Sequence, residues 1–197
     1  MRKWLVSGLA LVALAGGGYA AQARLTSASV PRCPASWGYE ALAKRVGVAV
    51  FCPTWLPQPL TSQVRSEYST QPYVNGDGSY LVSYLWFEKD PTTPYEVHVN
   101  VRGFPGRTRI PACQDTMTEG EQTVPCFSDP AGTVRFGKLT ATVYTANQGI
   151  DTWHVLYAWH YKGSLYTVSQ HVAPPFTDVT VRRSLTHILR GLVLVNP

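Results

Sequence analysis

Residues 151–171, DTWHVLYAWHYKGSLYTVSQH, decide the fold of this chain. Two runs rich in Trp, Tyr, Val, Leu and Thr flank a Lys-Gly pair at 162–163, which predicts a β-hairpin with a two-residue turn. This register places Trp159 opposite Tyr166. Because successive strand side chains point to opposite faces, one face of the hairpin gathers large side chains. They are Trp153, Val155, Tyr157, Trp159, Tyr166 and Val168.

The opposite face of the hairpin is smaller and more polar. It carries His154, Leu156, Ala158, His160, Thr167, Ser169 and His171. Burying a large apolar side chain gains roughly 1.5–3 kcal/mol, so we expect the aromatic face to be covered. We expect the polar face to stay partly wet or lightly covered.

An amphipathic segment after the hairpin is the candidate cover for the aromatic face. Thr177 is a predicted helix N-cap, and Gly191 follows the predicted end near Arg190. Its apolar stripe consists of Val181, Leu185, Ile188, Leu189 and Leu192. Upstream, strands are expected at 48–51, 63–70, 79–88, 95–102, 134–136 and 139–145, and a short helix capped by Ser36 is expected at 36–46. The sequence therefore predicts an α+β fold, a single antiparallel twisted sheet packed by a C-terminal helix, with a short N-terminal helix.

The N-terminus has the features of an export signal. A basic pair at 2–3 precedes an apolar run at 4–15, and Ala21-Gln22-Ala23 is a small-x-small cleavage site. The alternative is an uncleaved membrane anchor, since residues 4–23 carry no charge and a bilayer requires about 20 residues. The glycine run at 16–18 weakens a spanning helix and favours cleavage.

The chain is accordingly divided into three parts, and the protein is expected to be secreted or extracytoplasmic. The parts are a signal peptide at 1–23, a linker at 24–34 and a single α+β domain at 35–197. The formal net charge is +5, and two of the positive charges lie in the leader. Since no concentrated basic stripe is present, nucleic-acid binding is not expected.

Export allows the four cysteines to be oxidised. They are Cys33, Cys52, Cys113 and Cys126, and three pairings are possible. We favour the sequence-local pairing, Cys33 with Cys52 and Cys113 with Cys126, because a link across roughly 15 residues stabilises a fold by about 3 kcal/mol. The rival interpretation is a metal site, which the absence of a C-x-x-C pair disfavours.

Three short motifs resemble a broad group of poorly characterised exported domains of Gram-positive and actinobacterial cell envelopes. They are PTWLP at 53–57, the W-x-x-x-G-x-x-Y pattern of Trp159, Gly163 and Tyr166, and S-L-x-x-I-L at 184–189. Some members of the group are attached to anti-sigma or lipoprotein-like proteins. The resemblance runs from residue 48 to the C-terminus and implies a fold and an envelope location. It supplies no catalytic residues, and the cysteine pairs are not features of the group.

Histidines are the first candidates for chemistry. His154 and His171 are directly opposed in the predicted hairpin, and His98 on another strand could join them. Imidazoles arranged in this way can bind Zn²⁺ or Cu²⁺. The simpler interpretation is that they are polar positions on a wet face, and we therefore expect no metal and no cofactor.

Catalytic motifs are absent from the sequence. It contains no G-x-S-x-G, H-E-x-x-H, Walker or glycine-rich dinucleotide pattern, so no catalytic residue is assigned. The segment 103–130 lacks periodicity, and Arg107 and Arg109 within it could hold an anionic partner. Trp153, Tyr157 and Trp159 could contact a small apolar ligand held between sheet and helix.

The sequence favours a non-catalytic extracytoplasmic binding or protein-interaction domain at the cell envelope. Its partner would be an unknown protein or small molecule, and the domain is expected to be a monomer. Contact with a membrane is expected only if the N-terminal segment stays attached. The alternative is a secreted hydrolase whose active site carries no recognisable motif.

Overall fold

The computed structural model describes residues 32–60, 64–65, 73–87, 96–115, 122–144 and 154–197. All of these belong to one structural unit, Pro31–Pro197. The predicted leader lies outside the described residues. None of the described helices is both long and apolar enough to cross a bilayer.

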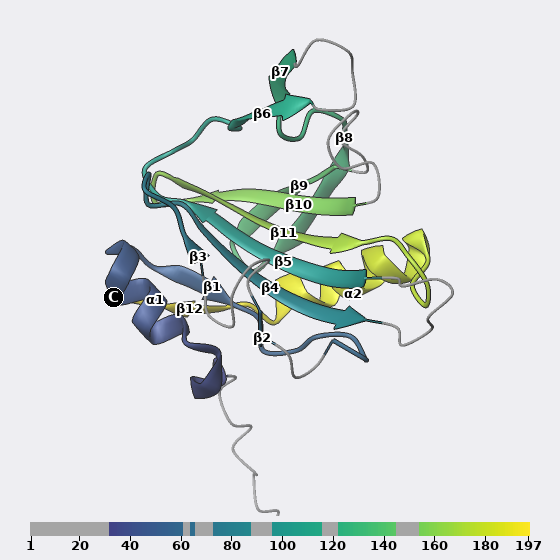
Figure 1. Cartoon of the computed structure of the whole chain (residues 1–197), viewed down its shortest axis with the longest axis horizontal. Coiled ribbons are helices and arrows are strands. Elements are labelled where there is room, and N and C mark those ends of the chain that lie inside the picture. Colours follow the sequence, from purple (N-terminus) through teal and green to yellow (C-terminus); the bar gives the residue numbers. More distant parts are fainter. Residues whose placement is uncertain (1–31, 61–63, 66–72, 88–95, 116–121, 145–153) are drawn as a thin grey trace, which may run out of the picture. The chain divides into compact units, whose positions relative to one another are not determined.

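The main sheet is antiparallel, and its strands follow the order β2-β4-β5-β11-β10-β9-β8, with β3 also paired to β4 (Figure 1). The strands are β2 (Val64–Arg65), β3 (Tyr73–Val74), β4 (Tyr80–Phe87), β5 (Glu96–Phe104), β8 (Pro130–Phe136), β9 (Leu139–Tyr144), β10 (His154–Tyr161) and β11 (Ser164–His171). This confirms the predicted α+β class. The sheet order places β5 beside β11, which brings distant parts of the chain together.

The predicted hairpin register is confirmed. Trp159 lies opposite Tyr166 and Tyr161 opposite Ser164. Both turn residues have positive φ, 45° at Lys162 and 75° at Gly163. A type I′ turn requires this combination, so Lys162 occupies a position more often held by Asn, Asp or Gly.

Helix α2 (Asp178–Arg190) covers the aromatic face of β10 and β11, as predicted, and lies behind the sheet in Figure 1. Tyr157 reaches the helix through its hydroxyl, which lies 3.3 Å from the Arg182 carbonyl oxygen and 3.2 Å from Thr186 Oγ1. Thr177 caps the helix, and its side chain accepts a hydrogen bond from the Thr180 amide. The fully buried side chains of this layer include Val155, Trp159, Tyr166, Val168, Val181, Leu185, Ile188 and Leu189.

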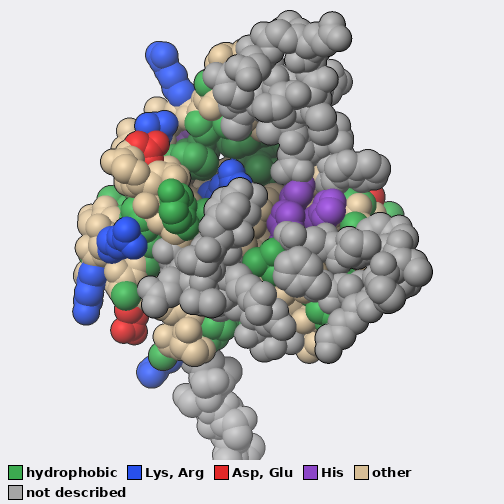
Figure 2. Space-filling view, viewed as in Figure 1, with side chains coloured by type: hydrophobic (Ala, Val, Ile, Leu, Met, Phe, Trp, Pro, Cys, Tyr) green, Lys and Arg blue, Asp and Glu red, His purple; other side chains and the backbone are tan. Residues whose placement is uncertain are grey.

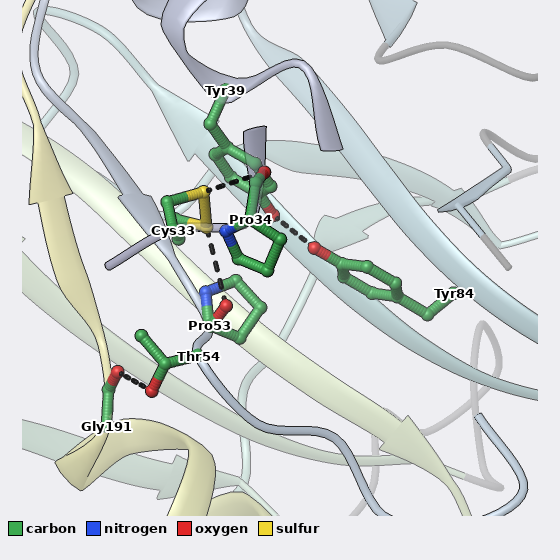
Figure 3. The surroundings of a disulfide bond; sticks show 8 residues. Cys33, Pro34, Tyr39, Pro53, Thr54, Tyr84 and Gly191 are labelled. Atoms are coloured by element: carbon green, nitrogen blue, oxygen red, sulfur yellow. Dashed lines mark hydrogen bonds between the residues drawn. A yellow bond between two sulfur atoms is a disulfide. The ribbon is translucent and has the colours of Figure 1, made fainter. Parts of the chain in front are cut away.

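The N-terminal part covers the same sheet face nearer to β4. It comprises η1 (Ala35–Trp37), α1 (Tyr39–Val46) and β1 (Val50–Cys52), which pairs with β12 (Val193–Val195). Figure 3 shows the predicted Cys33–Cys52 disulfide, which is confirmed, and the Tyr39 hydroxyl 3.0 Å from the Tyr84 hydroxyl. The disulfide fastens the segment before η1 to β1, and the Tyr39 contact fastens α1 to β4 of the sheet.

The predicted start of the first helix is wrong. Gly38, with φ 69°, ends the 3-10 turn and stands at the N-cap of α1 in place of Ser36. In the helix that follows, Tyr39 and Ala43 face the core while Ala41 is exposed. The periodicity of apolar side chains does not reveal the break at Gly38. The break depends on a left-handed backbone conformation, which only glycine adopts without strain.

The PTWLP segment, which follows β1, contacts the C-terminal end of α2. Thr54 donates a hydrogen bond to the Gly191 carbonyl oxygen, with the two oxygens 2.7 Å apart (Figure 3). Leu56 is buried, whereas Trp55 is 37% exposed. Its ring stacks on that of His187, with the ring centres 4.1 Å apart.

The expectation that 103–130 is irregular is wrong in part. Strands β6 (Ala112–Asp115) and β7 (Gln122–Pro125) form a small separate hairpin within it. Both are only four residues long, which is too short to show alternation.

Cys126 is disulfide-bonded, but the side chain of Cys113 lies outside the described residues, so their pairing stays a prediction.

Candidate functional site

The sheet face opposite α2 is less wet than its composition suggests. Thr167 and Ser169 are buried, and His154 is only 8% exposed. Part of the cover comes from Phe127, which packs with Ala158 and Leu165 in a second apolar cluster. The face is therefore partly covered, and a residue remote in sequence supplies the cover over Ala158 and Leu165.

A row of buried polar side chains crosses the middle of this face. Ser83, Asn100 and Ser169 lie side by side on β4, β5 and β11. Ser83 Oγ donates to Asn100 Oδ1, and the two oxygens are 2.6 Å apart. This hydrogen bond satisfies part of the row, and buried polar groups without such bonds would be costly.

The next row holds three histidines, which we call the histidine cluster: His98 on β5, His171 on β11 and His154 on β10. The ring centres are 4.6 Å apart for His98 and His154, 5.0 Å for His154 and His171, and 5.4 Å for His98 and His171. Each imidazole therefore contacts the other two. Figure 2 shows histidine side chains gathered on the sheet face turned away from α2.

The backbone explains why the three imidazoles meet. His98 is two residues before Asn100 and His171 is two residues after Ser169, so both point to the face that carries the polar row. His154 is directly opposite His171 in the hairpin. Strand β11 lies between β5 and β10. The rings of His98 and His154, on the two outer strands, therefore approach each other beside the ring of His171 on β11.

The closest contact in the cluster joins two ring nitrogens. His98 Nε2 and His154 Nε2 are 2.6 Å apart. Two lone pairs facing each other at this distance would repel, so one Nε2 must carry a hydrogen and the other must accept it. The two rings therefore share one hydrogen through their Nε2 atoms.

The third ring is oriented differently toward its neighbours. His171 stacks on His154 with an angle of 13° between the ring planes. The rings of His98 and His154 are tilted by 35°. Among the described residues, no set of three or more His, Cys, Asp or Glu side chains is placed to hold a metal ion together. A cluster of this kind can still hold a cation between two of its nitrogens, or donate hydrogen bonds to an anion.

The other predicted binding residues are dispersed. Tyr157 and Trp159 are core side chains beneath α2, and Trp153 lies outside the described residues. Arg107 forms an ion pair with Asp77, with 3.0 Å between nitrogen and oxygen, and Arg109 is exposed. The structure therefore does not gather the four described residues at one place.

Two of the five histidines stand apart from the cluster. His160, at the exposed end of the same strand face, donates through Nε2 to the Thr108 carbonyl oxygen at 2.7 Å. His187 lies on α2 beneath the ring of Trp55. Their separation makes both of them useful controls.

Two surface hollows lie away from the cluster. One, of about 500 Å³, is lined by Tyr73, Asn75, Ser79, Tyr80, Leu81, Arg102 and Phe104. Beside it, hydrogen bonds from the Ser79 hydroxyl and amide lower the pKa of Asp77. The other, of about 590 Å³, is lined by Arg182, Arg183, Thr186, His187, Arg190 and Gly191.

Sequence reasoning missed the basic hollow on α2, although its signal is visible. The arginines at 182, 183 and 190 and the histidine at 187 recur at helical spacing on the face opposite the apolar stripe.

Comparison of the chain with protein-family models, curated proteins and solved structures gives no match.

Proposed function

We propose that this chain is a non-catalytic extracytoplasmic binding domain at the cell envelope and that the histidine cluster holds its ligand. The observation that carries the proposal is the meeting of three imidazoles on the sheet face opposite α2. The resemblance to exported envelope domains is consistent with the proposed location.

The cluster has no evident value for folding. Leucine at such positions would bury apolar area without a desolvation cost, whereas each imidazole must find polar partners. Leu85, directly opposite His98 on β4, shows that the face accepts leucine. Side chains that depart from the pattern which best stabilises a fold mark functional positions.

The disulfide supports the proposed location. Cys33 and Cys52 are bonded in the structure, and such bonds persist chiefly in oxidising compartments outside the cytosol. The export signal predicted for residues 1–23 agrees with this.

Native mass spectrometry of the full chain, purified without denaturation, tests the proposal. We expect a bound molecule or protein partner that is retained by His160→Ala and lost from His154→Ala. His160 is the matched control because it lies on the same strand but outside the cluster. A ligand retained equally by both variants, or none in the wild-type protein from its native source, would contradict the proposal.

A further inference from the structure

The strand register builds a second hollow on the sheet face that carries the histidine cluster. Arg102 follows His98 by four residues of β5, so both side chains point to this face, about 13 Å apart along the strand. Leu81 lies directly opposite Arg102 on β4, and Tyr73 lies directly opposite Leu81 on β3. These three side chains therefore form one row across three strands, and the row lines the hollow of about 500 Å³.

The exposed fractions show that the middle of this row is recessed. Leu81 is only 8% exposed, whereas Tyr73 is 47% exposed and Arg102 is exposed on the other side of it. The half-buried ring of Phe104, two residues further along β5, adds apolar surface to the same hollow. An apolar floor with a few polar groups around it, in a volume of about 300–1,000 Å³, is typical of small-molecule sites.

One positive charge at the hollow has no partner. The side chain of Arg102 forms no ion pair or hydrogen bond with any residue that the structure describes, whereas Arg107 is paired with Asp77. This ion pair lies next to the hollow, because Asp77 also accepts hydrogen bonds from Ser79 in its wall. Two positive charges and one negative charge leave one positive charge, which suits a ligand with a single negative charge.

We infer that this hollow binds a small carboxylate with an aromatic or apolar body. The planar guanidinium of Arg102 can donate two parallel hydrogen bonds to a carboxylate. The body of the ligand then lies on Leu81 and beside the ring of Tyr73, which is one of the few large apolar side chains that the described residues expose. A doubly charged phosphate is disfavoured, because it would meet only one unneutralised positive charge.

The hollow also offers one hydrogen-bond acceptor to its ligand. The side-chain amide nitrogen of Asn75 donates to Ser79 Oγ at 2.9 Å, which leaves the carbonyl oxygen of the same side chain to accept. A hydroxyl or amine on the body of the ligand would satisfy it. The site is separate from the histidine cluster, and the inference does not rest on the function proposed for the cluster.

Titration of the ¹⁵N-labelled full chain, followed by NMR, tests the inference with three probes. Phenylacetate carries both the charge and the ring, phenylacetamide lacks the charge, and acetate lacks the ring. Phenylacetate should shift the amide signals of Tyr73, Asn75 and Leu81 saturably, with a Kd in the millimolar range expected for so small a molecule. Phenylacetamide and acetate should each bind at least about fivefold more weakly.

Three results of this titration would overturn the inference. They are equal binding of phenylacetamide and phenylacetate, tighter binding of inorganic phosphate than of phenylacetate, and the absence of saturable shifts at the hollow. Shifts centred on His98, His154 and His171 instead would place the carboxylate at the histidine cluster, which also contradicts the assignment to the hollow.

Substitutions at exposed positions assign the two parts of the ligand without disturbing the core. Arg102→Gln should weaken phenylacetate binding by at least about tenfold, whereas Arg135→Gln, at an exposed position of β8, should leave it unchanged. Tyr73→Ser should weaken the binding of phenylacetate but not that of acetate. Equal weakening by the two arginine substitutions, or equal loss of both probes in Tyr73→Ser, would refute the proposed arrangement.

Discussion

The two faces of the main sheet have different chemistry, although the same strands form both. Toward α2, Val155, Trp159 and Val168 are fully buried among apolar neighbours. On the opposite face, the same hairpin presents Thr167, Ser169 and two of the clustered histidines. The α2 face explains why the chain folds, whereas the histidine face contains groups that folding alone does not require.

Alkaline pH should produce the largest effect, and it should act on the α2 face. Burial raises the pKa of Tyr39, Tyr80 and Tyr84. The stability contributed by each neutral hydroxyl is complete below the unfolded pKa of about 10 and is lost as pH rises toward the folded value. We expect cooperative unfolding above that pH.

Tyrosinate absorbance and circular dichroism, followed together during the titration, check this expectation. The last tyrosines should ionise in the same transition that removes the tertiary signal. Full ionisation of all tyrosines in a protein that keeps its tertiary signal would show that these hydroxyls are not buried.

Truncation beneath α2 should have the next largest effect. Leu185 is fully buried, and Leu185→Ala should lower the free energy of unfolding by about 2–5 kcal/mol because it leaves a cavity. Val179, on the same helix, is 64% exposed, and Val179→Ala should change stability by less than about 0.5 kcal/mol. Urea denaturation measures both, and similar losses would refute the placement of the helix.

Removal of the disulfide should cost less than the larger core truncations. The double variant Cys33→Ser with Cys52→Ser frees the segment before η1 from β1, and should lose about 3 kcal/mol of unfolding free energy. Chemical denaturation of the variant, compared with wild type before and after reduction, measures the loss. A reduced wild-type protein as stable as the oxidised one would show that the link is dispensable.

The smallest effect is expected on the histidine face, where one polar pair serves the structure. Ser83→Ala removes the donor to Asn100 Oδ1 and should cost about 1–3 kcal/mol, since the acceptor stays buried. Adding Asn100→Val should restore part of this loss, because both partners are then apolar. Denaturant midpoints of the single and double variants test this, and additive losses would contradict it.

Much of the α2 face could be predicted from the sequence. Alternation around Lys162-Gly163 determined the hairpin register, and Thr177 and Gly191 marked the two ends of α2. These signals are local, involving residues close together in the chain. The prediction of where α1 starts was wrong for a local reason as well, since Gly38 interrupts the helical pattern.

The histidine face was predictable only in part. The pairing of His154 with His171 follows from the hairpin, and the sequence offers His98 as a third member. Its contact with both depends on β5 lying beside β11, which is a choice among distant strands that periodicity cannot reveal. The packing of Phe127 on this face could not be predicted for the same reason. Sequence alone does not indicate on which face of the sheet a distant apolar residue packs.

The most direct test of the difference between the faces is a double variant, His98→Leu with His154→Leu, compared with wild type for stability and for bound ligand. If the imidazoles serve binding, the variant should unfold within about 1 kcal/mol of the wild-type protein, because both partners of the contact are replaced together. It should also lose the molecule or ion that co-purifies with the wild-type chain. A variant that retains this ligand, or that no longer folds, would contradict the assignment of the histidine cluster to binding.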